Sequence, residues 1–382
     1  MKKLSIGLVI ALGLVGCKKK KEEENKEPAP MVTETGSAGS AAAGSGSAAA
    51  PEKPLTGAEL ATVYQKCVAM ISDGKLDDFV STCIAADYKG HDMDMGDMSG
   101  TDAIKNELAS LRTAFPDFKM SPQLVMVSGR NILAVELTQG TNSGPMKMGN
   151  GPEMPATNKK MGTLMFHRLT INDQNKANEE WVYQDPLTMM SQLGMSPKGA
   201  PPMRPAMEKG WEGAPIIVVT ADDDKEKKNL AVIKAMDDAF NAHKADAMVA
   251  SLSDDFVMSD QSEPKDVTSK KDAEKAIKEM FTGFPDAKVT SDNTWAGGDY
   301  VVELGTMDAT NTGDMGPMKK TGKKVSLHFA EVSKLKDGKI TNLWRFDNGM
   351  AMAQQLGMMP APGAGAGSAA GSAAAGSAAP KK

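Results

Sequence analysis

Apolar residues recur at two spacings along the chain, and the two spacings occur twice in the same order. Within residues 59–71 and 229–240 they fall three and four positions apart, which is typical of amphipathic helices. Further along, alternation with a period of two predicts β-strands. The remaining expected helices cover a short segment ending near residue 85 and residues 102–114 and 272–282, and the expected strands cover residues 123–138, 162–171, 179–184, 288–307, 325–335 and 340–346. Helices followed by antiparallel strands predict an α+β fold.

Short motifs also occur twice, which indicates a tandem repeat. The separation between matching motifs stays between 163 and 169 residues. The matched motifs are Phe115-Pro116-Asp117 with Phe284-Pro285-Asp286, Gly140-Thr141 with Gly305-Thr306, Trp181 with Trp344, and Gln192-Leu193-Gly194-Met195 with Gln355-Leu356-Gly357-Met358. Each half exceeds about 130 residues, enough for a core of its own, so the two halves are expected to fold as separate units.

Composition divides the chain further. Residues 18–27 are a charge run, and residues 36–50 and the C-terminal tail consist largely of Gly, Ser and Ala. Such sequences bury too little apolar surface to fold. One exception lies between the repeats, where residues 215–220 form a strand-like run that we expect to extend an exposed sheet edge. The predicted organisation is a signal peptide at 1–16, a tether at 17–56, a first domain at 57–197, a linker at 198–225, a second domain at 226–360 and a disordered tail at 361–382.

The N-terminus has the pattern of a targeting segment. Lys2 and Lys3 precede an apolar run of 13 residues that is too short to span a bilayer, which takes about 20 residues. The run ends in Leu14-Val15-Gly16-Cys17, which resembles the lipobox of bacterial lipoproteins. That resemblance implies lipidation of Cys17 and a lipid anchor in the cell envelope, at the outer membrane because Lys18 follows. The alternative is a short hydrophobic N-terminus with a chance cysteine.

The other two cysteines, Cys67 and Cys83, lie at equal distances on either side of Lys75, in two helices expected to form an antiparallel hairpin. With Cys17 used for lipid, they remain as an even pair in an oxidising compartment, which predicts a disulfide. The alternative is two buried free thiols that act as small hydrophobic side chains.

The repeated Phe-Pro-Asp and Gly-Thr motifs, together with Asp337-Gly338-Lys339-Ile340, Trp344 and Gln-Leu-Gly, resemble the SnoaL-like polyketide cyclase or ester cyclase family of the nuclear transport factor two-like superfamily. The resemblance implies two cones of curved antiparallel sheet wrapped on a helical hairpin, each with a pocket at its open end. The family includes enzymes and non-catalytic ligand-binding modules, so the fold does not fix the function.

Enzymes of this family use a His and an Asp for general acid–base catalysis. The resemblance implies that the first half carries such a pair. His167 and Asp185 are the candidate pair, with His91 at the pocket mouth. The alternative is that His167 is a half-buried strand residue and that Asp185 caps the last helix. Aligned on Trp344 without gaps, Ala330 and Asn348 replace the pair in the second half, which predicts a binding or packing module there. The residues expected to line the pockets are Trp181, Tyr183, Trp295, Trp344 and Phe346.

Methionine is unusually frequent, with 29 residues. His91, Met93, Met95 and Met98 lie close together, and thioethers suit Cu(I), so a copper site is one alternative. The other is that methionine fills irregular apolar spaces, with no cofactor present.

The net charge of −5 and the aromatic fraction of 5% argue against nucleic-acid binding. The sequence therefore predicts a lipid-anchored envelope protein that binds a small apolar or amphipathic ligand or a partner, with pairing of its domains or a homodimer as further contacts. The alternatives are an acid–base enzyme working in the first pocket and a copper protein.

Overall fold

The computed structural model describes residues 53–92, 96–147, 153–196, 203–316 and 318–359. The predicted signal peptide, Cys17, the tether up to residue 52 and the tail lie outside these residues, as do Met93 and Met95. Among the described residues, no helix is both long enough and apolar enough to cross a bilayer.

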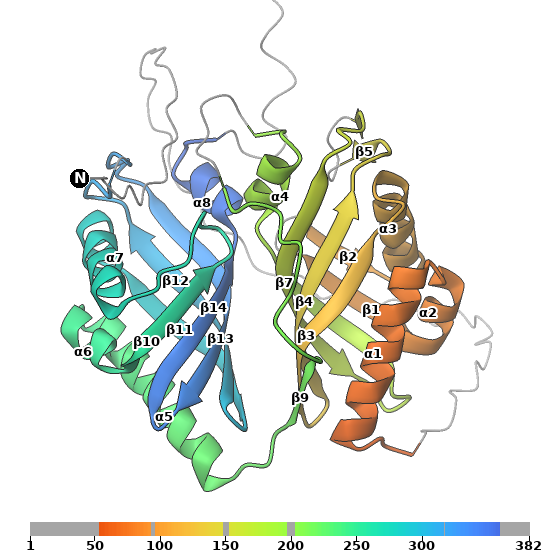
Figure 1. Ribbon diagram of the computed structural model, residues 1–382, viewed down its shortest axis with the longest axis horizontal. Coiled ribbons are helices and arrows are strands. Elements are labelled where there is room, and N and C mark those ends of the chain that lie inside the picture. The colour runs from red at the N-terminus through yellow and green to blue at the C-terminus, as the bar shows by residue number, and fades with distance from the viewer. Residues whose placement is uncertain (1–52, 93–95, 148–152, 197–202, 317, 360–382) are drawn as a thin grey trace, which may run out of the picture.

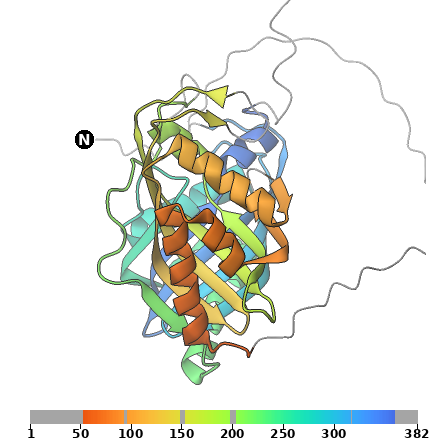
Figure 2. The same cartoon turned by 90° about the vertical axis from the view of Figure 1, so that its right-hand side faces the viewer.

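The described residues of the first half, with the linker, form four helices and nine strands. The helices are α1 (Gly57–Asp73), α2 (Leu76–Cys83), α3 (Thr101–Ala114) and α4 (Pro186–Gln192). The strands are β1 (Ile84–Asp92), β2 (Gly96–Ser99), β3 (Lys119–Ser128), β4 (Asn131–Thr141), β5 (Met146–Lys147), β6 (Glu153–Met154), β7 (Lys160–Ile171), β8 (Ala177–Tyr183) and β9 (Ile216–Val219). Seven of them form one sheet in the order β2-β1-β8-β7-β4-β3-β9, and helices α1 to α3 cover its outer face (Figure 2).

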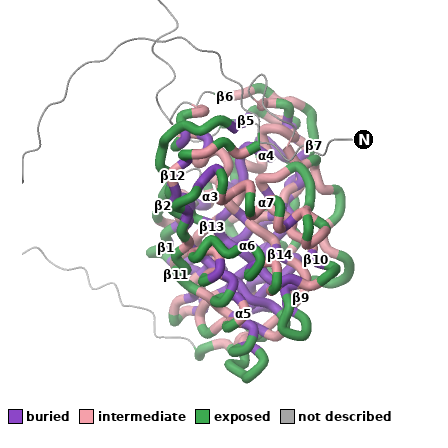
Figure 3. Tube along the Cα trace, turned by 90° about the vertical axis from the view of Figure 1, so that its left-hand side faces the viewer, coloured by how far each residue is buried: buried purple, intermediate pink, exposed green. Residues whose placement is uncertain are grey.

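The second half repeats this plan with a smaller sheet. Its helices are α5 (Asp224–Asn241), α6 (Ala245–Ala250), α7 (Lys270–Gly283) and α8 (Gly349–Gln355), and its strands are β10 (Leu252–Asp260), β11 (Lys288–Gly297), β12 (Tyr300–Thr310), β13 (Lys324–Lys336) and β14 (Lys339–Asp347). The sheet order is β10-β14-β13-β12-β11. Viewed from this half, exposed residues lie on the outside of the trace and buried residues run through its middle (Figure 3).

The predicted α+β fold and the tandem repeat are confirmed. Strands β1 and β10 were not predicted: they follow the helical hairpin and pair in parallel with β8 and β14, respectively. The strand-like run of the linker does extend a sheet edge, because β9 pairs in parallel with β3.

The repeated Phe-Pro-Asp motif has the same structural role in both halves. Phe115 and Phe284 are fully buried at the end of α3 and α7. The Asp117 carboxylate accepts hydrogen bonds from the backbone N and the hydroxyl of Thr141, at 2.6 and 2.8 Å, and Asp286 does the same with Thr310, at 2.7 and 2.6 Å. Thr141 therefore corresponds to Thr310, and matching Gly140-Thr141 with Gly305-Thr306 was wrong.

A disulfide joins the helical hairpin of the first half. Gly74 has a φ of +75° and ends α1 in the left-handed conformation, so that α2 can fold back beside it. Cys67 on α1 and Cys83 on α2 are bonded, with their Cα atoms 6.1 Å apart. Closing a loop of this length contributes about 3 kcal/mol of stability.

The sheets of the two halves pack face to face, with α1 to α3 and α5 to α7 on the outside and α4 and α8 close together at one end (Figure 1). The residues between the sheets form one buried apolar cluster, the inter-sheet core, made of Leu124, Met126, Leu133, Val135, Leu137, Leu164, Phe166, Tyr183, Tyr300, Val302, Leu304, Ala330, Val332 and Phe346. Each half therefore uses one face of its sheet for its own helices and the other face for its partner half.

Candidate functional site

A cavity of about 250 Å³ lies inside the first half, between its helices and the helix-facing side of its sheet. Most of its wall is aliphatic, aromatic or thioether, including Leu60, Val68, Phe79, Leu108, Phe118 and Met161. The Cys67–Cys83 disulfide also lines it, so the bond fixes two helices of the cavity wall. A cavity with this lining favours an apolar ligand over a hydrophilic one.

One polar cluster on the cavity wall centres on Glu180 of β8. Its carboxylate is 2.7 Å from Nδ1 of His167 on β7 and accepts a hydrogen bond of 2.5 Å from the hydroxyl of Tyr88 on β1. All three residues line the cavity. Burial by itself would raise the pKa of Glu180, but the hydrogen bond and the charge of His167, together with the Tyr88 bond, hold that pKa below its usual value. Glu180 is thus an anion that fixes the orientation of the His167 ring.

A second buried carboxyl, Glu136 on β4, lies nearby. The hydroxyl of Tyr64 on α1 donates to its Oε1 at 2.6 Å. Glu136 is completely buried, and its Oε2 has no hydrogen-bond partner among the residues that the structure describes. Burial raises the pKa of Glu136, although the charge of His167 and the Tyr64 bond act in the opposite direction. Burial also raises the pKa of Tyr64 well above its ordinary value.

Asp185 does not join His167. It caps the N-terminus of α4, where its carboxylate accepts from the backbone N and the hydroxyl of Thr188 at 2.9 and 2.7 Å. Its neighbours Gln184 and Pro186 line the cavity instead. The predicted His167–Asp185 pair is therefore wrong, and Glu180 takes the place of the aspartate. The capping alternative describes Asp185 correctly.

His91 lies at the edge of the cavity, on strand β1. Its ring stacks on Trp181 at a centroid distance of 5.1 Å. Its nitrogens are 2.9 Å from Asp97 and 3.2 Å from Glu179. Because these contacts face away from Glu180, the structure places His91 beside the His167 cluster and not within it.

The aromatic residues predicted to line the pockets lie elsewhere. Tyr183 and Phe346 belong to the inter-sheet core, and Trp181, Trp295 and Trp344 pack against it. The alternation along β8 explains the error: Trp181 and Tyr183 point toward the other sheet, so Glu180 and Val182 point into the cavity. A signal for Glu180 was present in the sequence, as a charged residue that alternates with Val182 on the side of β8 opposite to Trp181 and Tyr183.

The second half replaces this cavity chemistry with a different polar cluster. In β4–β7, Ala134 is opposite His167, whereas in β12–β13 Glu303 is opposite Glu331. Glu331, and not Ala330, therefore corresponds to His167. The ungapped alignment failed because equivalent paired residues are one position closer in sequence in the second half: Phe166 pairs with Tyr183, 17 positions on, but Ala330 pairs with Phe346, 16 positions on.

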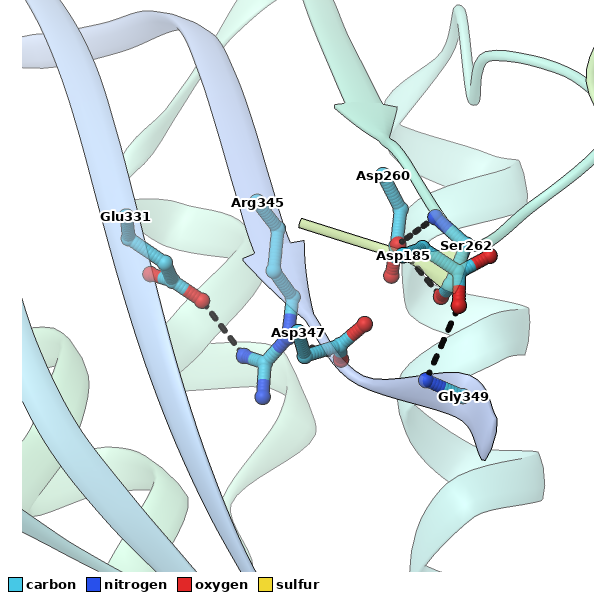
Figure 4. A network of polar contacts seen from close by, with 7 residues as sticks. All are labelled: Asp185, Asp260, Ser262, Glu331, Arg345, Asp347 and Gly349. Carbon is cyan, nitrogen blue, oxygen red and sulfur yellow. Dashed lines mark hydrogen bonds and ion pairs between the residues drawn. The ribbon is translucent and has the colours of Figure 1, made fainter. Parts of the chain in front are cut away.

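Four acidic groups and one arginine meet in this cluster. Arg345 on β14 bonds Glu331 at 2.5 Å and Asp347 at 3.0 Å (Figure 4). The hydroxyl of Ser291 on β11 contacts both Glu303 and Asp237, the latter on α5. Burial, reinforced by the charges of neighbouring acids, raises the pKa of Glu303 to about 8 and that of Asp237 to about 6.

The cluster continues to the contact between the halves. Asp260 on β10 accepts from the backbone N and hydroxyl of Ser262 at 2.9 and 2.7 Å. Burial, with the charge of Asp347, raises its pKa to about 8. Asp185 accepts from the backbone N of Gly349 at 3.2 Å, which links α4 to α8 (Figure 4). Burial raises the pKa of Asp185 to about 6.

No three His, Cys, Asp or Glu side chains are arranged to hold a metal ion in the part of the chain that the structure describes. Met98, one of the residues considered for copper, lines the apolar cavity of the first half. The copper site itself stays a prediction, since Met93 and Met95 lie outside the described residues.

Comparison with known proteins gives the same two units. The sequence matches the family described as SnoaL-like polyketide cyclase over residues 61–193 and 230–356, more than half of the chain. Among solved structures, it is similar to AclR from Streptomyces galilaeus, described as a hydroxylase, with 26% identity over 36% of this chain and 85% of that chain and a TM-score of 0.33. It is also similar to a protein from Jannaschia sp. CCS1 described as a SnoaL-like polyketide cyclase, with 19% identity over 37% of this chain and 99% of that chain and a TM-score of 0.35. No curated protein matches the sequence.

Proposed function

The chain belongs to the SnoaL-like polyketide cyclase family, and on that premise we propose that its first half binds a small, largely apolar ligand in the cavity while its second half acts as a structural partner. The observation that carries the proposal is the contrast between the two interiors. The first is an apolar cavity with Glu180 and His167 on its wall, whereas in the second half Glu331, which matches His167, is bonded to Arg345, and Glu303 is bonded to Ser291. Convergent polar groups in an apolar cavity are typical of a small-molecule site.

Filling the cavity should abolish ligand binding. Leu108 on α3 lines the cavity and is the eighth residue of its helix, and Ile277 is the eighth residue of α7. Leu108→Trp is expected to weaken binding of an apolar fluorescent dye at least about tenfold, because the indole occupies the space, and Ile277→Trp should leave it unchanged. Dye titration measures the effect, and circular dichroism verifies the fold of both variants. Equal dye binding by both would show that the dye, and with it the proposed ligand, binds elsewhere.

A second candidate function is acid–base catalysis in the same cavity. It is favoured by the bond between Nδ1 of His167 and Glu180, since a carboxylate at one ring nitrogen orients the other for proton transfer. If His167 is a base, the protein should speed hydrogen–deuterium exchange next to the carbonyl of a bicyclic ketone such as tetralone, and His167→Gln should lower that rate about a hundredfold or more. NMR detects the exchange. A rate that is the same with and without protein rejects this candidate.

We place the protein in the bacterial cell envelope, anchored by lipid at Cys17. The support is the length of the apolar run at residues 4–16 and the Leu14-Val15-Gly16-Cys17 motif. Cys17→Ser should leave an unprocessed precursor and release the protein from the lipid fraction, because the thiol that would carry diacylglycerol is gone. Mass spectrometry of the N-terminus and detergent partitioning measure both effects. Normal processing of the variant would contradict the assignment.

A further inference from the structure

The polar end of the cavity in the first half is rich in buried acceptors and poor in cations. Glu180 lines it and is bonded to His167, and Glu136 lies behind Tyr64, which lines the cavity and donates to Glu136. The lining includes one lysine, Lys147, which is exposed. Arg168, next to His167 in sequence, lies on the other face of the sheet, with its guanidinium 4.4 Å from the ring of Trp181. Among the described residues that line the cavity, a carboxylate ligand would find no buried cation that is not already paired.

We propose that the cavity takes an apolar molecule that carries a hydroxyl or a protonated amine, and that it rejects the corresponding carboxylate. This inference rests on the proposed function and specifies its ligand. Its chemical basis is that an ionised ligand in a low-dielectric cavity needs a compensating charge, and the two buried carboxyl groups at this end offer acceptor oxygens. A hydroxyl or an ammonium group can donate to them.

Glu136 is the group that makes this selection. It lies on the same face of β4 as Ile132 and Thr138, both of which line the cavity, and opposite Met165, which also lines it. One of its oxygens is bonded to Tyr64, and the other, Oε2, is buried without a hydrogen-bond partner among the described residues. Buried polar atoms are normally satisfied, so an unsatisfied carboxyl oxygen beside a cavity indicates a donor that arrives with the ligand.

Three probes with one chain length test the inference on the unaltered protein: decanol, decylamine and decanoate, each displacing the apolar dye at neutral pH. We expect decanol and decylamine to displace it and decanoate to bind at least about tenfold more weakly, since its charge is uncompensated in the cavity. Displacement by decanoate at the same concentration as decanol would overturn the ligand class and leave the proposed function intact. If none of the three displaces the dye, the proposed function falls as well.

Variants assign the selection to Glu136. Glu136→Gln should reduce the preference for decylamine over decanoate at least about fivefold, because the acidic group is removed while its shape is kept. Glu179→Gln is the matched control, since Glu179 is a partly exposed residue of β8 that bonds His91 outside the polar cluster. An unchanged preference in Glu136→Gln, or an equal loss in Glu179→Gln, would contradict the role of Glu136. Were Glu136→Gln unable to fold, the three probes on the unaltered protein would still decide the ligand class.

Discussion

Residues 221–359, produced without the first half, should fail to form a stable soluble monomer. In the intact chain this half contributes Tyr300, Val302, Leu304, Ala330, Val332 and Phe346 to the inter-sheet core. Burying a large apolar side chain stabilises a protein by about 1.5–3 kcal/mol, so exposing this set costs on the order of 10 kcal/mol. That is as large as the whole stability of a typical domain, about 5–15 kcal/mol. The structure thus leads us to expect the opposite of separately folding halves.

The edge of the inter-sheet core adds a specific contact between the halves. The guanidinium of Arg168 lies 4.4 Å from the ring of Trp181 and 5.3 Å from the ring of Trp295, which belongs to the second half. Cation–π contacts of this kind contribute about 0.5–2 kcal/mol each. The isolated half would therefore also expose Trp295, and its free sheet face is expected to aggregate or to dimerise.

A cleavable linker provides the control for this experiment. A protease site inserted within residues 197–202 breaks the chain but keeps both halves present. The nicked protein should stay associated and unfold in one transition, because the inter-sheet core survives the cut. Gel filtration and urea unfolding followed by circular dichroism compare the nicked protein with the isolated half. A soluble monomeric half that unfolds cooperatively at a midpoint similar to that of the intact chain would disprove the expectation.

The elements of this fold could be predicted because they depend on local sequence. Helical spacing located α1 and α5, and alternation located the strand region at residues 288–307, in which a two-residue turn at Gly298-Asp299 connects β11 and β12. The orientation of the strands could not be predicted in the same way. Alternation shows which residues share a face, but on β4 both faces are apolar: Ile132 and Ala134 point to the helices, while Leu133 and Val135 point to the other sheet.

The candidate site could be predicted only in part. His167 was identified through the family resemblance, which implies a histidine on a strand of the pocket, and the structure places it buried on the cavity wall. Its partner Glu180 was missed because Trp181 was assigned to the pocket. Since side chains alternate along a strand, that assignment placed Glu180 on the opposite side of β8, away from the pocket. The acids of the second half were missed because equivalent paired residues of its last two strands are one position closer in sequence, which shifts the ungapped alignment of the two halves. A shift of one residue exchanges Glu331, on the helix-facing side of β13, for Ala330, which lies in the inter-sheet core.

The free energy of unfolding of the whole chain should fall by several kcal/mol as the pH rises from about 5 to about 8. In the folded state, burial raises the pKa of Asp260 and Glu303 to about 8 and that of Asp185 and Asp237 to about 6. In the unfolded chain these carboxyls have ordinary values of about 4. Between these limits the folded state binds more protons, so stability is fully present below about pH 4 and is lost as each group ionises, at up to about 1.4 kcal/mol per pH unit for each proton.

The charged groups beside these carboxyls determine how much stability the protein loses as the pH rises. Arg345 compensates Glu331 and Asp347, and its pKa is raised because these acids outweigh the effect of burial. Glu303 has no such cation among its hydrogen-bond partners, which in the described structure include Ser291. Ionisation of Glu303 beside Asp237 and Glu331 therefore places like charges together in a buried site, and this site should account for much of the pH dependence.

Glu303→Gln tests that assignment, since the amide keeps the shape of the side chain and cannot ionise. The variant should show a smaller difference in the urea midpoint between pH 5 and pH 8 than the unaltered protein, by an amount equivalent to about 1–3 kcal/mol. Asp299→Asn is the matched control, because Asp299 lies in the exposed β11–β12 turn and pairs with Lys225 at the surface. The same pH dependence in Glu303→Gln as in the unaltered protein would show that Glu303 keeps an ordinary pKa, and stability that rises from pH 5 to pH 8 would refute the sign of the effect.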